Sequence, residues 1–484
     1  MKLKAFTEIV QSMLRRGIIR PSSSPYNHQA FLVPKQCPKS QRASDMWRLV
    51  NDLSGLNQVM RPLKIDPPPV SAIFSALQGA TTFSALDMVE SFWQMRLADD
   101  AAQCTAFQVP PADRYEFCRA PMGMQSSSSW MERNVRRILS GYDTVYAVHY
   151  IDDILCFSGG PSDPTDQRSR IARHLDITEK VLNRLWFFGV TLGVRKCTWA
   201  QPSADFLGHR VNSEGIQPSP RLCQGIADLS EPSSLSDLER LIGMLRFQAK
   251  FIPKFSQHLE PLQAKLSELL LSGRSSASKA RISLSSEERA AFSDLKNTIV
   301  GFMSTPTTLY LMQWHRTLHL ESDASAHAVA GWAFQYDLDD DVVDTMSEED
   351  LKPHIRPVAF VSRRLKRTER LWNKPSGKIP CSAADALADL QSNPEKIADI
   401  GAGNGITELE CLAALFLVEQ VSDFIEGARR SILRTDHKHI IWLLQSSNSR
   451  VVRWALKLSA YPRLLFRFQK GSKMVTSPPT LFLA

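Results

Sequence analysis

The chain has 484 residues, of which 43% are hydrophobic, so it is long enough for two to four globular domains with substantial cores. Its formal net charge of +8 is compatible with a polyanionic partner but does not by itself establish one. The eight cysteines form no C-x-x-C pair and no apolar run reaches membrane-spanning length, which argues against a disulfide framework, a zinc site and a membrane partner, and favours a reducing, intracellular and cytoplasmic location.

The N-terminal part of the chain predicts one helix followed by a hairpin. An amphipathic pattern over residues 5–16 stops at a glycine and predicts the helix. Apolar stretches over 31–35 and 47–53 predict the two strands, and each carries a cation, Lys35 and Arg48. A guanidinium donates hydrogen bonds in parallel pairs, which suits a phosphate contact. The alternative is that both cations are solvated charges at strand edges.

Two adjacent carboxylates stand in the most distinctive hairpin of the sequence. Apolar arms over 145–148 and 154–157 predict two short strands, and the turn between them runs from Tyr150 to Asp153. The neighbouring carboxylates of Asp152 and Asp153 repel each other unless a cation lies nearby. Mg²⁺ prefers such hard oxygen ligands and keeps positions open for phosphates. A solvated Asp-Asp turn is the alternative interpretation.

A second apolar strand, predicted over 82–88, also carries a carboxylate at its end, Asp87. A two-metal phosphoryl-transfer site needs carboxylates from separate segments that converge on ions about 4 Å apart. Asp87 and Asp152 are far apart in the sequence, so only a fold that pairs their strands brings them together.

In their order and spacing, these segments resemble the reverse transcriptase region of the Pol polyprotein of gypsy-type LTR retrotransposons. The resemblance also rests on Pro121-Met-Gly-Met124 and on Lys196-Cys197 followed by Phe206-Leu-Gly-His209. It implies a right-hand polymerase of fingers, palm and thumb, with two Mg²⁺ ions held by three carboxylates. These implied metal ligands are Asp87, Asp152 and Asp153. The implied substrate-binding residues are Lys35, Arg48, Phe92, Met122, Gly123 and Tyr150.

By the same resemblance, Phe92 lies under the sugar of the incoming deoxynucleoside triphosphate and excludes a 2′-hydroxyl. Its alternative role is plain core packing. The chain departs from the family after Met124, where the usual Asn-Ala-Pro run is replaced by Gln125–Ser129. Because proline presets a helix start more firmly than serine, this departure puts substrate positioning in question, but not the carboxylates.

The middle of the chain predicts a helical thumb and connection over residues 213–300. Ser236-Asp-Leu-Glu239 has the pattern of a capping box. The serine-rich, basic stretch 272–286 has the composition of a flexible linker.

Three further carboxylates point to a second site. The alternating stretch 317–323 predicts a strand ending in Asp323, the stretch 431–436 predicts another ending in Asp436, and Glu410 stands on a helix opened by Thr407. Their order resembles the RNase H domain that follows the polymerase in gypsy-type elements, which implies that all three are metal ligands. The alternative for Glu410 is the third helical position of a capping box with Thr407.

Two departures affect this last domain. Residues 373–406 form an insertion, expected to be a surface loop, and Pro478 stands where the family places a final aspartate. Proline offers no side-chain oxygen to a second ion. We therefore expect RNase H activity to be weak or absent, with Mn²⁺ a better activator than Mg²⁺.

Together these features predict an α/β and α+β multidomain protein with fingers and palm at 1–212, thumb and connection at 213–300, and an RNase H-like domain at 301–484. The expected function is RNA-directed DNA synthesis on RNA and DNA template-primers, with RNA–DNA hybrids as substrate of the last domain. The main alternative is a decayed, non-catalytic product that binds template-primer as a structural subunit. A DNA-templated polymerase is less compatible with the RNase H-like segment.

Overall fold

The computed structural model describes residues 2–34, 46–109, 113–160, 164, 166–271, 281–370, 404–435 and 449–468. The chain divides into two compact units, Met1–Leu207 and Gly208–Ala484. The predicted boundary at residue 212 lies close to this division, whereas the one at residue 300 lies inside the second unit. No helix in the described ranges is both long enough and apolar enough to cross a bilayer.

The first unit begins with a layer of short strands beside one amphipathic helix. Its elements are α1 (Lys2–Arg15), β1 (Ile19–Pro21), β2 (Ala30–Pro34), β3 (Trp47–Asn51), α3 (Ser54–Val59), α5 (Asp99–Gln103), β5 (Phe107–Val109) and β6 (Asp113–Phe117). The predicted β2–β3 hairpin is confirmed, and a separate sheet has the order β1-β6-β5. Apolar residues of α1, including Phe6 and Met13, are buried against Phe107 and Phe117.

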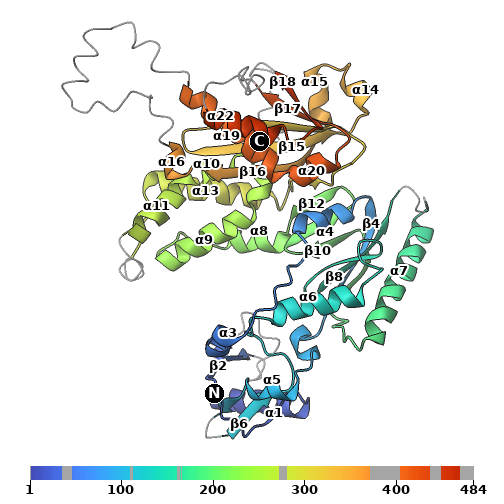
Figure 1. Cartoon of the computed structure of the whole chain (residues 1–484), viewed down its shortest axis with the longest axis vertical. Coiled ribbons are helices and arrows are strands. Elements are labelled where there is room, and N and C mark those ends of the chain that lie inside the picture. Colours follow the sequence, from blue (N-terminus) through green and yellow to red (C-terminus); the bar gives the residue numbers. More distant parts are fainter. Residues whose placement is uncertain are drawn as a thin grey trace, which may run out of the picture. The chain divides into compact units, whose positions relative to one another are not determined.

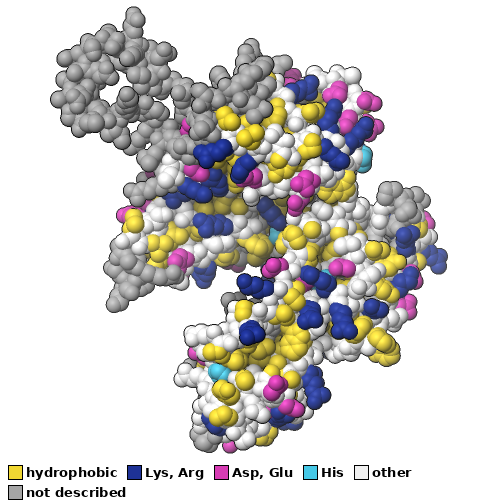
Figure 2. Space-filling model, in the orientation of Figure 1, with side chains coloured by type: hydrophobic (Ala, Val, Ile, Leu, Met, Phe, Trp, Pro, Cys, Tyr) yellow, Lys and Arg dark blue, Asp and Glu magenta, His cyan; other side chains and the backbone are white. Residues whose placement is uncertain are grey.

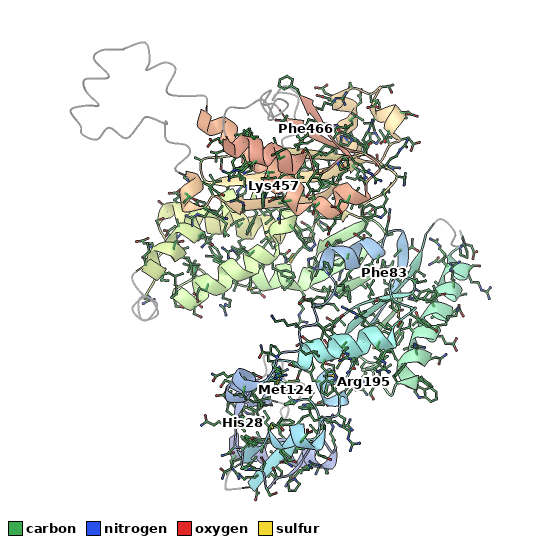
Figure 3. All side chains as sticks on the ribbon, in the orientation of Figure 1. His28, Phe83, Met124, Arg195, Lys457 and Phe466 are labelled. Atoms are coloured by element: carbon green, nitrogen blue, oxygen red, sulfur yellow. The ribbon has the colours of Figure 1, made fainter. Side chains whose placement is uncertain are left out.

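The central sheet of the first unit has the order β7-β8-β4-β9. This part of the first unit contains α4 (Val70–Ala76), β4 (Ala80–Asp87), η1 (Ser91–Gln94), α6 (Ser127–Ile138), β7 (Ala147–Tyr150), β8 (Asp153–Gly159), α7 (Gln167–Phe187) and β9 (Thr198–Gln201). Strand β10 (Ser203–Phe206) follows β9 in the chain but is not a strand of this sheet. β4 pairs antiparallel with both β8 and β9, and Phe83 on β4 is fully buried (Figures 1 and 3).

Helices α6 and α7 cover one face of this sheet. Leu86 and Ile154 from neighbouring strands share a core with Val135 of α6 and Val181 of α7. Because side chains alternate along a strand, the residues that follow Leu86 and precede Ile154 point to the opposite face. That alternation places Asp87 and its cross-strand partner away from the helix-covered core.

The second unit contains a five-stranded sheet of order β16-β15-β14-β17-β18. The strands are β14 (Leu318–Ala324), β15 (Ala328–Tyr336), β16 (Ile355–Arg364), β17 (Ser431–Thr435) and β18 (Leu464–Phe468). β14, β15 and β16 are antiparallel, and β14, β17 and β18 are parallel. The strand predictions over 317–323 and 431–436 are therefore confirmed over the described residues.

Two helices, α19 (Asn404–Gln420) and α22 (Ser449–Leu458), pack on this sheet through one apolar core (Figure 1). Gly331 on β15 permits the close approach, because a Cβ there would meet Leu417 of α19 at 2.9 Å. Trp454, Tyr461 and Phe466 pack partly buried against the same core, so these aromatic side chains have a structural role. Phe466 is labelled in Figure 3.

The rest of the second unit is mainly helical. It comprises β11 (His209–Asn212), β12 (Gly215–Pro218), α8 (Pro220–Ala227), α9 (Leu235–Phe247), η2 (Ala249–Phe251), α10 (Phe255–His258), α11 (Glu260–Leu271), α13 (Ser286–Gly301), β13 (Leu309–Tyr310), α14 (Asp340–Val343), α15 (Glu348–Leu351), η3 (Lys352–His354), α16 (Arg367–Arg370) and α20 (Ser422–Gly427). η2 and α10 pack against β16, so the helical part and the sheet form one compact body.

One capping prediction and one capping alternative are wrong. The N-cap of helix α9 is Ser234, two residues before the predicted Ser236, because the side chain of Ser234 accepts a hydrogen bond from the Asp237 backbone nitrogen at 3.1 Å. Helix α19 begins at Asn404, so Thr407 already lies inside it and Glu410 is not at the third position of a cap. Most of the predicted 373–406 insertion and much of the 272–286 linker lie outside the described residues.

Candidate active site

The pairing of β4 with β8 brings two predicted carboxylates face to face. Asp87 at the end of β4 is the direct cross-strand partner of Asp153 at the start of β8. Directly opposed residues of an antiparallel pair have their side chains on the same face, about 4.5–5.5 Å apart at Cβ. Two positions that are distant in the sequence therefore meet where the two central strands of the sheet end and begin, as the two-metal hypothesis requires.

Asp152 stands beside this pair in a tighter turn than the sequence predicts. Tyr150 ends β7 and pairs with Asp153, so the turn consists of Ile151 and Asp152 alone. The hydroxyl of Ser91 donates a hydrogen bond of 2.6 Å to Asp152 Oδ2. Ile151 has a φ of +59°, a left-handed conformation that a β-branched residue rarely adopts.

The three carboxylates influence one another electrostatically. The pKa of Asp153 is raised, and the largest cause is desolvation of its carboxylate by neighbouring atoms, even though part of the residue is exposed. The negative charges of Asp152 and Asp87 raise the pKa further. Lys196 opposes this shift, and its ammonium lies 3.0 Å from Asp87 Oδ2. The arrangement is a concentration of negative charge that one nearby cation only partly balances.

Lys196 is a site residue whose contact the sequence reasoning missed. Lys196-Cys197 carries part of the family resemblance, but nothing in its local pattern places the ammonium on Asp87. The contact arises because β9, which begins two residues later, pairs with β4. Cys197 belongs to the same junction, since its Sγ accepts a hydrogen bond from the Asp87 backbone nitrogen.

The donor set fits a divalent cation such as Mg²⁺, because all three side chains offer hard carboxylate oxygens and their mutual repulsion favours a positive charge between them. Within the described ranges, however, no group of three or more His, Cys, Asp or Glu side chains is already arranged to hold a metal ion. Asp87 faces Lys196 and Asp152 faces Ser91, so side-chain adjustment would accompany metal binding.

The segment 121–124, which contains the implied substrate-binding residues Met122 and Gly123, is held by hydrogen bonds from α3. The side-chain amide of Asn57 donates to the Gly123 carbonyl at 2.9 Å, and its oxygen accepts from the Gln125 backbone nitrogen at 2.9 Å. Gly123 has a φ of +90°, which favours glycine. Met122 is half-buried beside it, and Met124, labelled in Figure 3, packs partly buried against both cores of the first unit.

The serine run that replaces the family's proline still starts a helix. α6 begins at Ser127, whose hydroxyl donates to the Pro121 carbonyl at 3.1 Å. Ser126 accepts from the Leu63 backbone nitrogen at 3.3 Å. These contacts hold the segment through side chains where the family pattern relies on a fixed proline ring.

The remaining substrate-binding candidates differ in exposure and in the element that carries them. Arg48 is exposed on β3, and Lys35 lies outside the described residues. Phe92 is half-buried in η1 against the core of the central sheet, and Tyr150 is half-buried at the end of β7. Figure 2 shows further Lys and Arg side chains between apolar ones on the visible face of the first unit.

A second candidate site lies at the end of β14. Asp323 is the penultimate residue of this strand, and Lys254 Nζ lies 2.6 Å from its Oδ2. Glu410 is half-buried on α19, the helix that packs on β14 and β15. β17 runs parallel to β14 and ends at Thr435, directly before Asp436 in the sequence; Asp436 and Pro478 themselves lie outside the described residues.

Comparisons with known proteins identify two segments of the chain. Residues 28–211 match the family described as "Reverse transcriptase (RNA-dependent DNA polymerase)", and residues 402–461 match the "RNase H-like domain found in reverse transcriptase". These matches confirm the resemblance stated from the sequence.

Among curated proteins, the chain is 27% identical over 455 residues to the Retrovirus-related Pol polyprotein from transposon opus of Drosophila melanogaster. It is 25% identical over 452 residues to the corresponding polyprotein from transposon gypsy of the same organism. The alignments cover 93% and 92% of this chain but only 39% and 37% of the relatives, so the chain spans about two fifths of their length.

Among solved structures, the fold is similar to a foamy viral protease-reverse transcriptase in complex with double-stranded DNA, with a TM-score of 0.71, 18% identity and coverage of 96% of this chain and 69% of that one. It is also similar to a foamy viral protease-reverse transcriptase in complex with an RNA/DNA hybrid, with a TM-score of 0.68, 19% identity and coverage of 96% and 53%. The predicted combination of a right-hand polymerase and an RNase H-like domain is confirmed.

Proposed function

Because the chain carries a reverse transcriptase domain and, after it, an RNase H-like domain of the kind found in reverse transcriptases, we propose that it is an RNA-directed DNA polymerase of a retrotransposon. It would extend a primer with deoxynucleoside triphosphates on an RNA or DNA template. The observation that carries the proposal is the register of β4 against β8, which sets Asp87 opposite Asp153 beside the Asp152 turn.

In the proposed reaction, the primer 3′-hydroxyl attacks the α-phosphorus of the incoming triphosphate and pyrophosphate leaves. Asp87, Asp152 and Asp153 would hold two Mg²⁺ ions, which supply the positive charge that activates the hydroxyl and stabilises the leaving group. Arg48, and Lys35 by its place in the sequence, would contact the phosphates. Phe92 would lie against the sugar, and the turn at Gly123 would support the nucleotide through its backbone.

Nucleic acids are the proposed partners. The foamy viral relatives were solved with double-stranded DNA and with an RNA/DNA hybrid, and the basic balance of this chain suits the same polyanions. We place the protein inside the cell, in the cytoplasm and within element-derived particles, a proposal supported by six described cysteines that are all free thiols.

We propose hydrolysis of the RNA strand of hybrids as a second activity, weaker than polymerisation. Asp323 at the end of β14 and Glu410 on the helix that packs on this strand support it, with Asp436 as the third carboxylate. The alternative of a non-catalytic product that only binds template-primer is disfavoured, because the polymerase carboxylates are present and their strands pair in register.

The proposal is tested by incubating the purified full chain with an RNA template, a labelled DNA primer and the four deoxynucleoside triphosphates. We expect primer extension in Mg²⁺ that stops when EDTA is added and resumes with excess Mg²⁺. Extension that is equal with and without the chelator, or none in either Mg²⁺ or Mn²⁺ while the primer-template still binds, would contradict it.

A further inference from the structure

The turn that carries Asp152 is held in a disfavoured shape by a group outside the strands. Ile151 adopts a φ of +59°, which a β-branched side chain resists. Such a conformation persists only where surrounding contacts fix it. The 2.6 Å hydrogen bond from the Ser91 hydroxyl holds the side chain of Asp152, and it does not involve the backbone of Ile151. The backbone therefore needs another support.

Glu132 on α6 supplies that support. Its side chain is fully buried, and its Oε2 accepts a hydrogen bond of 3.0 Å from the Ile151 backbone nitrogen. A buried carboxylate binds an amide strongly, because charge-assisted hydrogen bonds are stronger than neutral ones and water does not compete. α6 is itself anchored in the core of the central sheet through Met131 and Val135. The contact thus ties the turn to a rigid helix.

The charge of Glu132 is balanced from two sides, as a buried charge requires. His149 Nε2 donates to Glu132 Oε1 at 3.1 Å, and Arg136 donates to the same oxygen at 2.9 Å. The other ring nitrogen of His149 faces Asp143 Oδ1 at 3.3 Å. Burial works against the charged imidazole, but these two carboxylates raise the pKa of His149 to about 9, so both ring nitrogens carry protons at neutral pH.

Glu132 touches none of the proposed metal ligands directly. It reaches Asp152 only through the amide of the preceding residue, while His149 stands on β7 three residues before Asp152. Two roles are therefore carried by different residues. Asp152 would bind the metal, and the buried pair of Glu132 and His149 fixes the position of the turn.

We propose that Glu132, oriented by His149 and Arg136, is a positioning residue that holds the Ile151–Asp152 turn in the conformation needed for catalysis. This inference rests on the proposed polymerase function. It adds a structural requirement that lies outside the carboxylate site. Loss of the Glu132 side chain lowers kcat and leaves the Kd for template-primer unchanged.

Three variants of the full chain test it. Glu132→Ala removes the acceptor of the Ile151 amide. Glu132→Gln keeps an oxygen acceptor at the same place, so it is the conservative rescue. His174→Ala is the matched control, because His174 is equally buried in the same unit and bridges the hydroxyls of Ser84 and Ser158 at 2.7 and 2.9 Å, away from the turn.

The first readout is amide hydrogen exchange in peptides spanning residues 147–154. Glu132→Ala should speed exchange at the turn by about tenfold or more, whereas Glu132→Gln and His174→Ala should stay near wild type. The second readout is single-nucleotide extension, in which Glu132→Ala should lower kcat by about 10- to 100-fold, the range seen when a partner that orients a metal ligand is removed. The Kd for template-primer should not change.

The two readouts separate the two claims. Unchanged exchange at the turn in Glu132→Ala, or faster exchange with an unchanged kcat, would overturn the positioning role. Equal loss of kcat in His174→Ala would also overturn it, because the effect would then be general destabilisation. A wild-type chain that fails to extend any primer would instead overturn the proposed function, and the exchange data would still decide whether Glu132 holds the turn.

Discussion

At the scale of single residues, the candidate polymerase site consists of a few charged groups whose neighbours are set by strand pairing. Asp87 and Asp153 meet across two strands, and Lys196 and Ser91 contact the carboxylates from outside the hairpin. The buried ion pair of Glu132 and His149 lies behind the turn. Two measurable predictions belong to this scale, one for the buried ion pair and one for Phe92.

The buried ion pair predicts a pH-dependent contribution to stability. The pKa of His149 is raised from its ordinary 6.5 to about 9 in the folded chain. A raised pKa means that the contribution is fully present below pH 6.5 and is lost as the pH rises through about 9, with an upper size of about 3 kcal/mol. The charged groups facing the imidazole are Glu132 and Asp143, and Arg136 binds Glu132 from the other side.

The measurement is the difference in Tm between the wild type and His149→Gln from pH 6 to pH 10. Other titrating groups are common to both proteins and cancel in this difference. The gap should be largest at pH 6 and should close toward pH 10. A gap that stays constant over the range would show that His149 is uncharged in the folded protein.

Phe92 predicts a sugar-selection effect. It lies half-buried in η1 against the core of the central sheet, a place where it could contact a nucleotide sugar or serve only in packing. Phe92→Val would leave room for a 2′-hydroxyl, so discrimination against ribonucleotides should fall by roughly tenfold or more. Incorporation of each nucleotide type is measured as kcat/KM, and unchanged discrimination in a folded variant would assign Phe92 to the core.

At the scale of elements, the strands were predictable because periodicity and β-branched composition mark them clearly. The β2–β3 and β7–β8 hairpins and β14 follow the sequence pattern closely. Helix starts were less predictable: α19 begins at Asn404, ahead of the expected cap at Thr407. The contacts of Glu132 and Lys196 could not be read from the sequence, because they depend on how helices and strands pack in three dimensions.

The two hydrogen bonds from Asn57 of α3 to the turn at 121–125 predict that nucleotide binding weakens in steps as these bonds are removed. Asn57→Ala removes both hydrogen bonds to the turn, each worth about 1 kcal/mol, so the KM for deoxynucleoside triphosphates should rise by up to about 30-fold. Asn57→Asp keeps the acceptor for the Gln125 amide but loses the donor to Gly123, so its KM should be intermediate. Equal KM values in both variants and the wild type would show that α3 does not support the turn.

At the scale of the whole molecule, two carboxylate sites follow each other along one chain, each at the end of a strand. The polymerase site keeps all three expected carboxylates. The RNase H-like site has Asp323 and Glu410 in the described part of the chain, with the ammonium of Lys254 beside Asp323. By the resemblance stated from the sequence, Pro478 stands where the family is expected to have a fourth carboxylate. The two activities should therefore differ in strength.

We predict weak or absent hydrolysis of RNA–DNA hybrids in Mg²⁺. A site short of one carboxylate binds its second ion poorly, so Mn²⁺ should support cleavage better than Mg²⁺. Cleavage of a labelled hybrid is compared for the wild type, Pro478→Asp as the repair and Asp436→Asn as the blank. Strong cleavage by the wild type in Mg²⁺ that Pro478→Asp does not improve would show that the fourth ligand lies elsewhere.

The most direct test of the central claim is Mg²⁺-dependent extension by Asp152→Asn beside the wild type. The variant removes a proposed metal ligand but no proposed phosphate-binding cation, so synthesis should be abolished while the Kd for template-primer stays within about twofold. Asp176→Asn, on the exposed surface of α7, is the matched control and should extend primers like the wild type. Equal extension by Asp152→Asn and the wild type would contradict a polymerase site built on Asp87, Asp152 and Asp153.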